Sequence, residues 1–365
     1  MTATVMPGSV HIIGAGLLGT SVGLALRRAG VDVTLEDPSA EHVRIAVEKG
    51  AGRTAGSGDQ PVLVVVAVPP RRTGEVVANA TRRFPGVAVT DVASIKTVVL
   101  ADARAADADL THVVGGHPMA GRETSGPEGA RADLLDDRLW VITPTPEVDV
   151  EAVRMVHRLI TACGAYPVEM APEEHDRAVA LVSHVPQVLS SALAAQLVNG
   201  RPEDVRIAGQ GLRDMTRIAG SNLPMWSDII AGNAAPISAV LEGLLADLRS
   251  AQATLADLDR APSDRGALDR MEDLLARGGR GRELIPGKHG AAAADYAVVS
   301  VMIEDKPGRL GRLFVVAGDA GVNLEDVRIE HVLGRPSGLV ELFVQPSDAD
   351  ALIAAFRGQG IDVRA

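Results

Sequence analysis

Cysteine, aromatic side chains and positive charge are all scarce in this sequence. Cys163 is the single cysteine, which excludes an intrachain disulfide and any metal site built from several thiolates. Aromatic residues make up 2% of the 365 residues, so alanine, valine, leucine and isoleucine must form the cores. The 36 Lys and Arg residues against 47 Asp and Glu residues give a net charge of −11, which repels phosphate backbones and anionic membranes. Nucleic acid and membranes are therefore not expected as partners.

Long hydrophobic runs are missing too. The longest run covers residues 62–68 and ends at two prolines, well short of the roughly 18 apolar residues of a membrane helix. Residues 1–7 contain no basic side chain, so a secretion signal is not indicated. The nine histidines include no i, i+4 pair with an intervening acid, and no metal site is expected. These absences predict a cytoplasmic protein.

The first half of the chain alternates short β-branched runs with amphipathic stretches, as expected of βαβ units and a parallel sheet. We therefore predict an α/β, Rossmann-like doubly wound domain over residues 1–170. Its strands are expected at residues 10–13, 31–35, 62–68, 87–90, 111–114, 140–143 and 165–169. Its helices are expected at residues 18–29, 40–49, 73–83, 96–105 and 150–163.

From residue 171 the strand pattern gives way to apolar residues at helical spacing. An all-α helical domain is predicted over residues 171–280, and its very apolar stretch at 179–197 favours burial at a subunit interface, hence a homodimer. A Gly- and Arg-rich linker is expected at residues 281–294. Residues 295–365 follow the order βαββαβ, a ferredoxin-like arrangement.

A glycine-rich turn follows the first predicted strand and opens the first predicted helix, with the spacing G-x-G-x-x-G at residues 14–19. In that context the glycines permit a tight turn, close approach of a pyrophosphate and close packing of helix on strand. Asp37 lies 21 residues beyond Gly16, where a carboxylate accepts hydrogen bonds from ribose hydroxyls and repels a 2′-phosphate. This favours NAD over NADP, with Glu36 as the competing candidate for the same role.

Two more strand ends carry polar residues at the same edge of the sheet, in DVASIK at residues 91–96 and GGHPMAG at residues 115–121. Because ligands bind outside the carboxyl ends of parallel strands, Ser94, Lys96 and His117 should face the nicotinamide. His117 lies between glycines and a proline in a predicted loop, which favours a functional role. The rigid VPP turn at residues 68–70 could border the nicotinamide or could simply end its strand. The predicted cofactor-binding residues are Gly14, Gly16, Leu17, Leu18, Gly19, Asp37, Val68, Pro69 and Ser94.

With these motifs the sequence resembles the prephenate/arogenate dehydrogenase family of tyrosine biosynthesis, whose members use an NAD-type cofactor. The resemblance covers nearly the whole chain. It rests on GAGLLGTS, DVASIK and GGHPMAG in the first domain, and on LVSHVP and GLRDMTRIAGSNLPMW at residues 181–186 and 211–226. The tail, with EDKPGRL at residues 304–310, resembles an ACT domain, a regulatory module that often binds amino acids.

The resemblance implies an oxidative decarboxylation. The family's substrate is a cyclohexadiene with a ring carboxylate and a hydroxyl on the opposite carbon; hydride leaves that carbon for the nicotinamide, and carbon dioxide is lost as the ring becomes aromatic. His117 matches the catalytic histidine, and a neutral imidazole is suited to accept the hydroxyl proton at pH 7. Ser94 matches the serine that hydrogen-bonds the same hydroxyl and the histidine, whereas Lys96 could be structural and pair with Asp91 or a neighbouring carboxylate.

A dianionic substrate needs fixed positive charge. Arg217 matches the family's carboxylate-binding arginine, and a guanidinium fits a carboxylate with two parallel hydrogen bonds; from its spacing alone it would be a solvated helix residue. Ser183 and His184 could form a second polar patch at the substrate, or His184 could be a buried, hydrogen-bonded histidine. Trp226 matches a family position near the substrate and could equally fill the core.

Arg122 stands where relatives often carry a small hydroxyl or another neutral polar residue, and Glu123 follows it. A positive side chain at this position could add to carboxylate recognition or could simply point to solvent. Such loop positions could sense a keto-acid or an amino-acid side chain, so prephenate and arogenate both stay open, with prephenate preferred. A nicotinamide-dependent hydroxy-acid or imine reductase shares the glycine fingerprint, but it does not need Ser94, His117 and Arg217 together. An NAD-responsive sensor without turnover is supported only by the tail.

Three residues of the tail resemble the positions at which ACT domains bind an effector, commonly across two paired modules. They are Asp305, Gly308 and Asn323. Tyrosine or another aromatic amino acid bound there would lower activity through a difference in affinity between two states. The alternative is a module that only aids dimerisation.

Overall fold

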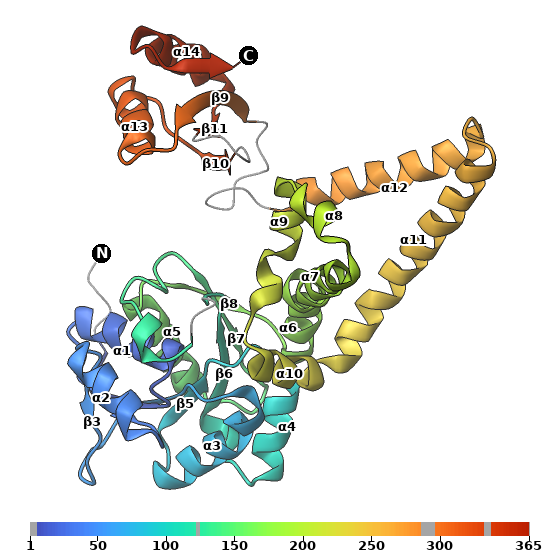
Figure 1. The fold of residues 1–365 in the computed structure, drawn as a ribbon. Helices are drawn as coiled ribbons and strands as arrows, with labels where there is room; N and C mark the ends of the chain where they lie inside the picture. The colour runs from blue at the N-terminus through green and yellow to red at the C-terminus, as the bar shows by residue number, and fades with distance from the viewer. Residues whose placement is uncertain (1–5, 122–124, 286–295, 332–336, 365) are drawn as a thin grey trace. The chain divides into compact units, whose positions relative to one another are not determined.

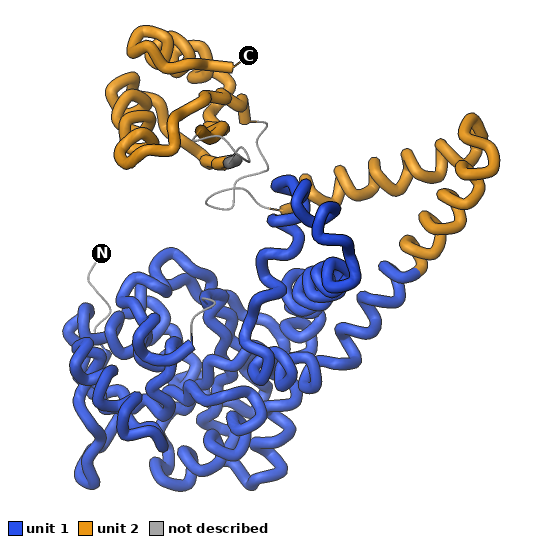
Figure 2. The backbone as a smooth tube through the Cα atoms, in the orientation of Figure 1, with its two compact units in different colours: residues 1–245 blue, residues 246–365 orange. Residues whose placement is uncertain are grey.

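The computed structural model describes residues 6–121, 125–285, 296–331 and 337–364. The chain divides into two compact units, residues 1–245 and residues 246–365 (Figure 2). The first unit holds an eight-stranded sheet with its covering helices and a helical segment (Figure 1). The second holds the end of a long helix, the helix after it, and a four-stranded sheet with two helices.

The strands of the large sheet follow the order β3-β2-β1-β4-β5-β6-β7-β8, which is a doubly wound arrangement. All seven predicted strands are confirmed. β3 has no counterpart among them, because two residues carry no periodic signal. The strands are β1 (Val10–Ile13), β2 (Val33–Glu36), β3 (Arg53–Thr54), β4 (Leu63–Val66), β5 (Ala88–Asp91), β6 (Val113–Pro118), β7 (Leu139–Thr143) and β8 (Tyr166–Glu169).

Helices cover both faces of this sheet because alternate residues of each strand point in opposite directions. In β4, Val65 packs with the helices α1, α2 and α5, whereas Val64 and Val66 pack with α3 and α4. Every side chain of this strand is buried, as in a central strand covered on both sides. The helices are α1 (Leu17–Arg28), α2 (Ala40–Glu48), α3 (Pro70–Arg83), α4 (Thr97–Ala105) and α5 (Val150–Ala162).

The expectation of a wholly parallel sheet is wrong at one place, because β7 runs antiparallel to β6. A parallel return requires a crossover, usually a helix, between the two strands. Between β6 and β7 the described residues contain only a short 3-10 turn, Pro127–Gly129. The chain therefore turns back beside β6 and extends it, and this places β7 along the segment that carries the GGHP motif.

The helical segment of the first unit begins with α6 (Pro172–Val179), a π-helical turn (Ala180–His184) and α7 (Val185–Gln196). The stretch Pro172–Asn199 is long and apolar enough, by length and composition, to cross a membrane. Buried helices of water-soluble proteins meet the same criterion, and this one carries the buried polar residues His175, Asp176 and Gln187. The segment continues through α8 (Pro202–Arg206), α9 (Gln210–Thr216), the 3-10 turn η5 (Arg217–Gly220), α10 (Leu223–Gly232) and α11 (Ala234–Arg260).

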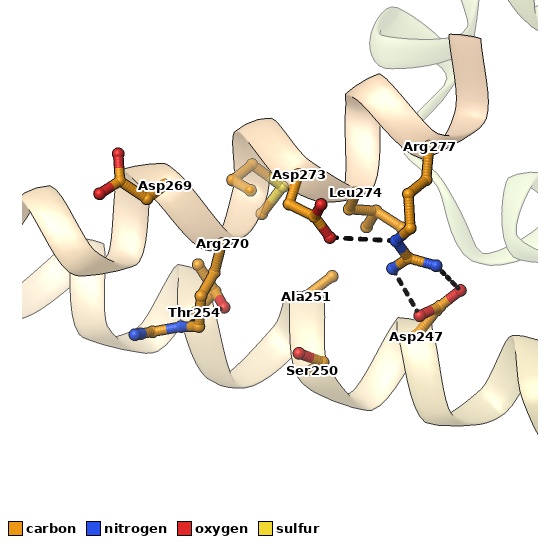
Figure 3. Close-up of a pocket in the computed structure, with 10 residues that line it drawn as sticks. Asp247, Ser250, Ala251, Thr254, Asp269, Arg270, Asp273, Leu274 and Arg277 are labelled. Carbon is orange, nitrogen blue, oxygen red and sulfur yellow. Dashed lines mark hydrogen bonds and ion pairs between the residues drawn. The ribbon is translucent and has the colours of Figure 1, made fainter. Parts of the chain in front are cut away.

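The helix α12 (Arg265–Glu283) extends into the linker predicted at residues 281–294. The prediction of a linker is therefore wrong at residues 281–283. Arg277 binds Asp273 on its own helix at 3.0 Å and Asp247 on α11 at 2.8 Å, as Figure 3 shows. Charged side chains thus stabilise a helix that its apolar pattern does not predict. Residues 286–295 of the predicted linker lie outside the described residues.

The carboxy-terminal module has the predicted βαββαβ order. Its antiparallel sheet has the strand order β10-β11-β9-β12, and its core includes Val301, Leu313, Leu342 and Phe356. The alternating burial of β11 reflects a sheet covered by helices on one face. The elements are β9 (Ala297–Glu304), α13 (Arg309–Asp319), β10 (Asp326–His331), β11 (Ser337–Val344), α14 (Ala349–Gly358) and β12 (Asp362–Arg364).

Candidate active site

The glycine turn between β1 and α1 has the backbone that a dinucleotide requires. Gly14 has φ +108°, and a Cβ there would overlap the carbonyl oxygen of Ala67. A Cβ at Gly19 would overlap the carbonyl oxygen of Gly14. Gly16 begins the helix without a side-chain cap, and no atom lies within 4 Å of the place where its Cβ would stand. The first and third glycines therefore shape the turn, and the second leaves space for a ligand at the helix N-terminus.

Two alanine substitutions should separate these roles. Gly14→Ala should lower the stability of the fold by several kcal/mol, because it combines a strained positive φ with overlap of backbone atoms. Gly16→Ala should leave the melting temperature nearly unchanged and weaken NAD binding about tenfold or more, since its methyl group occupies the open space. Differential scanning fluorimetry with and without NAD measures both effects. Equal behaviour of the two variants would contradict this division.

The side chain of Asp37 binds the glycine turn, whereas Glu36 contacts the turn through its backbone carbonyl, which accepts from the Gly14 amide at 2.7 Å. The carboxylate of Asp37 accepts hydrogen bonds from the backbone amides of Ala15 and Ser39, both at 2.8 Å. Glu36 pairs instead with Arg83, and its oxygen lies 3.3 Å from Nε2 of His11. Of the two acidic candidates, Asp37 is therefore the one next to the predicted dinucleotide site.

The loop after β4 also lies at the glycine turn. A Cβ on Gly14 would stand 3.2 Å from Cγ1 of Val68, and the amide of Ala67 donates to Ile13 at 2.7 Å. Pro69 is exposed, and Pro70 is the first residue of α3, where a missing amide proton costs nothing. Both readings of the two prolines fit this geometry, because they end β4 and also lie beside the site.

His117 is in a strand and not in the predicted loop. β6 continues through Pro118 because β7 pairs with it, and His117 lies opposite Val141. The two glycines before His117 make this pairing possible, since a Cβ at Gly115 would overlap the Thr143 hydroxyl and one at Gly116 would stand 2.5 Å from the carbonyl oxygen of Asp91. The histidine is thus placed by a strand, which holds it more rigidly than a loop would.

A buried ion pair fixes the backbone beneath His117. The Lys96 ammonium donates to Asp91 and, at 2.6 Å, to the carbonyl oxygen of Gly116. Asp91 also accepts from the amides of Ala93 at 2.8 Å and Gly116 at 3.3 Å. Both charged side chains are 2% exposed, and burial lowers the pKa of Lys96 although Asp91 raises it. The predicted pairing of Lys96 with Asp91 is confirmed, and the pair joins the Ser94 loop to β6.

The side chain of His117 contacts a second histidine from the helical segment. Nδ1 of His117 lies 2.8 Å from Nε2 of His175, and Nδ1 of His175 lies 2.8 Å from an Asp176 oxygen. Burial, the His175 ring and the Lys96 ammonium together lower the pKa of His117 well below 6.5. His117 is therefore neutral at pH 7, the state in which an imidazole accepts a proton.

His184 lies in the π-helical turn, completely buried, and belongs to the same cluster. The Asn233 amide nitrogen donates to the carbonyl oxygen of Asp176 at 2.8 Å and lies 2.9 Å from Nδ1 of His184. Burial is the main cause that lowers the pKa of His184 to about 4. The Trp226 ring meets His184 edge-on at 6.0 Å. The two readings of His184 are thus compatible, since it is buried and hydrogen-bonded beside the other histidines.

The Ser94 loop packs against α10 of the helical segment. Ala93 and Ile95 form a small core with Ile229 and Trp226, and Gly232 leaves space for the Ile95 side chain. Asn222 caps α10 by accepting from the amide of Met225 at 3.0 Å, as expected of asparagine at a helix start. Ser94 itself is half-buried. The structure therefore brings the serine loop, Trp226 and the three histidines together.

Arg217 is exposed at the first residue of η5, which Gln187 of α7 holds in place. The Gln187 amide donates to the carbonyl oxygen of Ile218 at 3.0 Å and accepts from the Ser221 hydroxyl at 3.3 Å. Ser183 is half-buried in the π-helical turn. The two hydrogen bonds that connect His117 through His175 to Asp176 involve neither Arg217 nor Ser183. Arg122 and Glu123 lie outside the described residues.

Sequence reasoning missed His175, Asp176 and Asn233. The acidic residues of PEEHDR are typical of an exposed first helical turn, and nothing in that run marks His175 and Asp176 as buried. The helical spacing could have indicated their burial. His175 and Asp176 precede the buried Val179 and Ala180 by four residues, so each pair lies on the same face of the helix.

Two family models match most of this chain. The model for the prephenate dehydrogenase nucleotide-binding domain matches residues 22–169, and the model for the prephenate dehydrogenase dimerization domain matches residues 171–267. The chain belongs to the prephenate dehydrogenase family. Prephenate dehydrogenases are NAD-dependent oxidoreductases, and this chain has their Rossmann-like nucleotide-binding domain followed by their helical dimerisation domain.

Relatives of known name and structure agree with this membership. A probable prephenate dehydrogenase, NovF, from Streptomyces niveus is 37% identical over 95% of this chain and 96% of its own length. A cyclohexadienyl dehydrogenase from Zymomonas mobilis is 32% identical over 68% of this chain and 89% of its own length. The solved prephenate dehydrogenase of A. aeolicus, in complex with hydroxyphenyl propionate and NAD+, is 27% identical with a TM-score of 0.66, covering 76% of this chain and 99% of the solved one.

Proposed function

We propose that this chain oxidises and decarboxylates prephenate with NAD to give 4-hydroxyphenylpyruvate in tyrosine biosynthesis. One observation carries the proposal beyond family membership. β1, β4, β5 and β6 are parallel neighbours, so the glycine turn, Val68, the Ser94 loop and the neutral His117 all lie at one edge of the sheet. A base is thus placed where the reacting end of a bound dinucleotide is expected.

The residues of the first domain fit NAD. Gly16 and the uncapped amides of α1 would hold the pyrophosphate, with Leu17 and Leu18 partly exposed beside them, and Asp37 would accept from the ribose. When bound, NAD supplies the acceptor for the hydride. The carboxylate of Asp37 would meet a 2′-phosphate with like charge, which supports NAD over NADP.

The chain's own residues handle the proton and the charges. His117 accepts the proton of the substrate hydroxyl as the carbon that bears it loses hydride, and Ser94 hydrogen-bonds the same oxygen. The bond from the ring to its carboxylate then breaks, its electron pair completes the aromatic ring, and carbon dioxide leaves. His117 returns its proton to the ring oxygen, which becomes the phenol. Arg217 holds a substrate carboxylate, and Ser183, His184 and Trp226 contribute to the pocket. Arg122 and Glu123, which lie outside the described residues, stay candidates for substrate recognition.

The decisive experiment offers prephenate and arogenate separately to the purified protein with NAD and follows NADH at 340 nm. We expect turnover of prephenate with kcat/KM at least tenfold above that of arogenate. The reverse order would make the enzyme an arogenate dehydrogenase. NAD binding without turnover of either compound would favour the alternatives, a hydroxy-acid or imine reductase or an NAD-responsive sensor.

We further propose that the carboxy-terminal module is an ACT domain and binds an aromatic amino acid. Gly308 begins α13 with φ +84°, and Asp305 lies in the same exposed loop after β9. Asn323 lies just before the start of β10. Through β11, the start of β10 aligns with the start of β9, whereas Asp305 and Gly308 follow the end of β9. Asn323 is therefore at the opposite end of the sheet from the other two residues. One effector can therefore contact all three residues only if two modules pair.

Titration of the full-length enzyme with tyrosine tests this proposal. We expect heat of binding in calorimetry and at least a twofold fall in prephenate turnover. Asn323→Ala should reduce both effects, whereas Asp362→Ala, an exposed change on β12, should not. Tyrosine that neither binds nor inhibits would favour a module that serves only in dimerisation.

The remaining assignments follow the boundaries expected from the sequence. The NAD-binding domain covers residues 1–170, the helical domain residues 171–280 with α12 extending it to Glu283, and the ACT domain residues 295–365. The meeting of the two family models at residues 169 and 171 supports the first boundary. A cytoplasmic homodimer agrees with the match to a dimerization domain and with the acidic surface.

A further inference from the structure

We propose that His175 and Asp176 are positioning residues that hold His117 with its proton on Nδ1, so that Nε2 is free to accept the substrate hydroxyl proton. The inference rests on the proposed function for the identity of that proton. For the rest it depends on the contacts of the half-buried His117 with the buried His175 and of His175 with Asp176. Neither residue belongs to a motif that pointed to the reaction.

The chain of contacts begins at a carboxylate that can only accept. The oxygens of Asp176 lie 2.9 Å and 2.8 Å from the backbone amides of Lys96 and Thr97, at the start of α4. Although burial would raise it, the hydrogen bonds from His175, Thr97 and Lys96 lower the pKa of Asp176 to about 2. Asp176 is therefore ionised at neutral pH, and the His175 nitrogen beside it must donate.

The hydrogen bond from His175 to Asp176 determines which nitrogen of His117 carries a proton. The His175 ring is completely buried and its Nδ1 donates to Asp176, so a ring that carries this one proton presents a lone pair at Nε2. That lone pair is 2.8 Å from Nδ1 of His117, and the two rings meet nearly edge-on with centroids 5.1 Å apart. Nδ1 of His117 therefore donates, and its only proton in the neutral state is placed there.

The same arrangement supports the charged state that follows proton transfer. When His117 takes a proton on Nε2, its Nδ1–H bond to His175 is kept, and the negative charge of Asp176 lies at the far end of the pair. This is the logic by which a carboxylate fixes the tautomer of a catalytic imidazole in hydrolytic triads, here with one more imidazole between them. A neutral imidazole in water favours the tautomer with the proton on Nε2. Without His175 and Asp176, His117 would therefore carry its proton on the nitrogen that must accept one from the substrate.

Two substitutions of His175 separate its two hydrogen bonds. His175→Asn places an amide near the position of Nδ1, so it can keep the bond to Asp176 and loses the acceptor for His117. His175→Gln reaches the position of Nε2, so it can accept from His117 and loses the bond to Asp176. The matched control is His157→Asn, which changes an exposed histidine paired with Glu169.

The test reads the tautomer by 15N NMR of histidine-labelled enzyme, assigned by comparison with His117→Asn, and reads kcat with prephenate and NAD. We expect wild-type His117 to be protonated on Nδ1. In His175→Asn the proton should move to Nε2 and kcat should fall about 10²–10⁴-fold with an unchanged Kd for NAD. His175→Gln should keep the Nδ1–H tautomer and stay within about tenfold of wild-type kcat.

Two results would overturn the inference. One is a wild-type His117 protonated on Nε2, as would follow if His175 were positively charged and donated from both nitrogens. The other is a His175→Asn variant with the wild-type tautomer and kcat. The tautomer is measured without substrate, so a wild-type enzyme that does not turn over prephenate would contradict the proposed function and leave this inference to be decided by the spectra.

Discussion

Replacement of His117 by asparagine is expected to lower kcat for prephenate by about 10³-fold or more while the Kd for NAD stays within a factor of two or so. A general base contributes 10²–10⁴-fold, and asparagine fills much of the same space without accepting a proton. The glycine turn and Asp37 are unchanged, so the cofactor should still bind. Stopped-flow or steady-state NADH formation gives kcat, and calorimetry gives the Kd for NAD.

The pH dependence provides a second check on the same residue. His117 must be neutral to accept a proton, and its pKa lies well below 6.5. Turnover should therefore stay level as the pH falls through 6.5 and decline only at more acidic pH, where the imidazole becomes protonated. The control variant His157→Asn should behave as wild type. An acidic limb centred at 6.5 or above, or an active His117→Asn enzyme, would contradict the assignment of His117 as the base.

Replacement of Lys96 by methionine is expected to lower the free energy of unfolding by about 3–5 kcal/mol. The change removes one half of an ion pair in which both side chains are 2% exposed, and it leaves the Asp91 carboxylate buried without its cation. It also removes the donor to the Gly116 carbonyl, so activity should fall with stability. Urea unfolding followed by circular dichroism measures the loss.

A double variant distinguishes the charge effect from the loss of packing. Lys96→Met combined with Asp91→Asn removes both charges and keeps an acceptor for the amide of Ala93, although not for that of Gly116, so it should recover part of the stability. Lys49→Met is the matched control, because Lys49 is exposed and donates to a backbone carbonyl. A single variant as stable as wild type, or a double variant less stable than the single, would contradict this account.

The sequence was sufficient for the elements whose signal is local. The strand–glycine–helix unit, the βαββαβ order and the position of His117 beside the Ser94 loop all follow from short patterns that local chemistry enforces. Lys96 could be paired with Asp91 in advance because both stand on one short loop. These features depend on residues close together in the chain.

Features that depend on contacts between distant segments could not be predicted. The sequence predicts His117 in a loop, whereas pairing with β7 extends its strand through Pro118. The direction of β7 depends on a connection without a crossover helix, which local patterns do not reveal. His175 and Asp176 have the appearance of exposed helix-start residues until α6 packs on the loop that begins α4. Hydrophobic periodicity does not report which polar residues a neighbouring domain buries.

The packing of α6 and α10 on the Ser94 loop also orders events during synthesis. The amides of Lys96 and Thr97 emerge from the ribosome about 80 residues before the carboxylate that accepts from them, and Asn233 follows later still. The nucleotide-binding domain can fold first, but the loop that carries Ser94 gains its hydrogen bonds to Asp176 only after the helical domain has been synthesised and has packed against it. A chain released early, or cleaved between the two domains, would keep a cradle for the dinucleotide and lack an ordered site for oxidation.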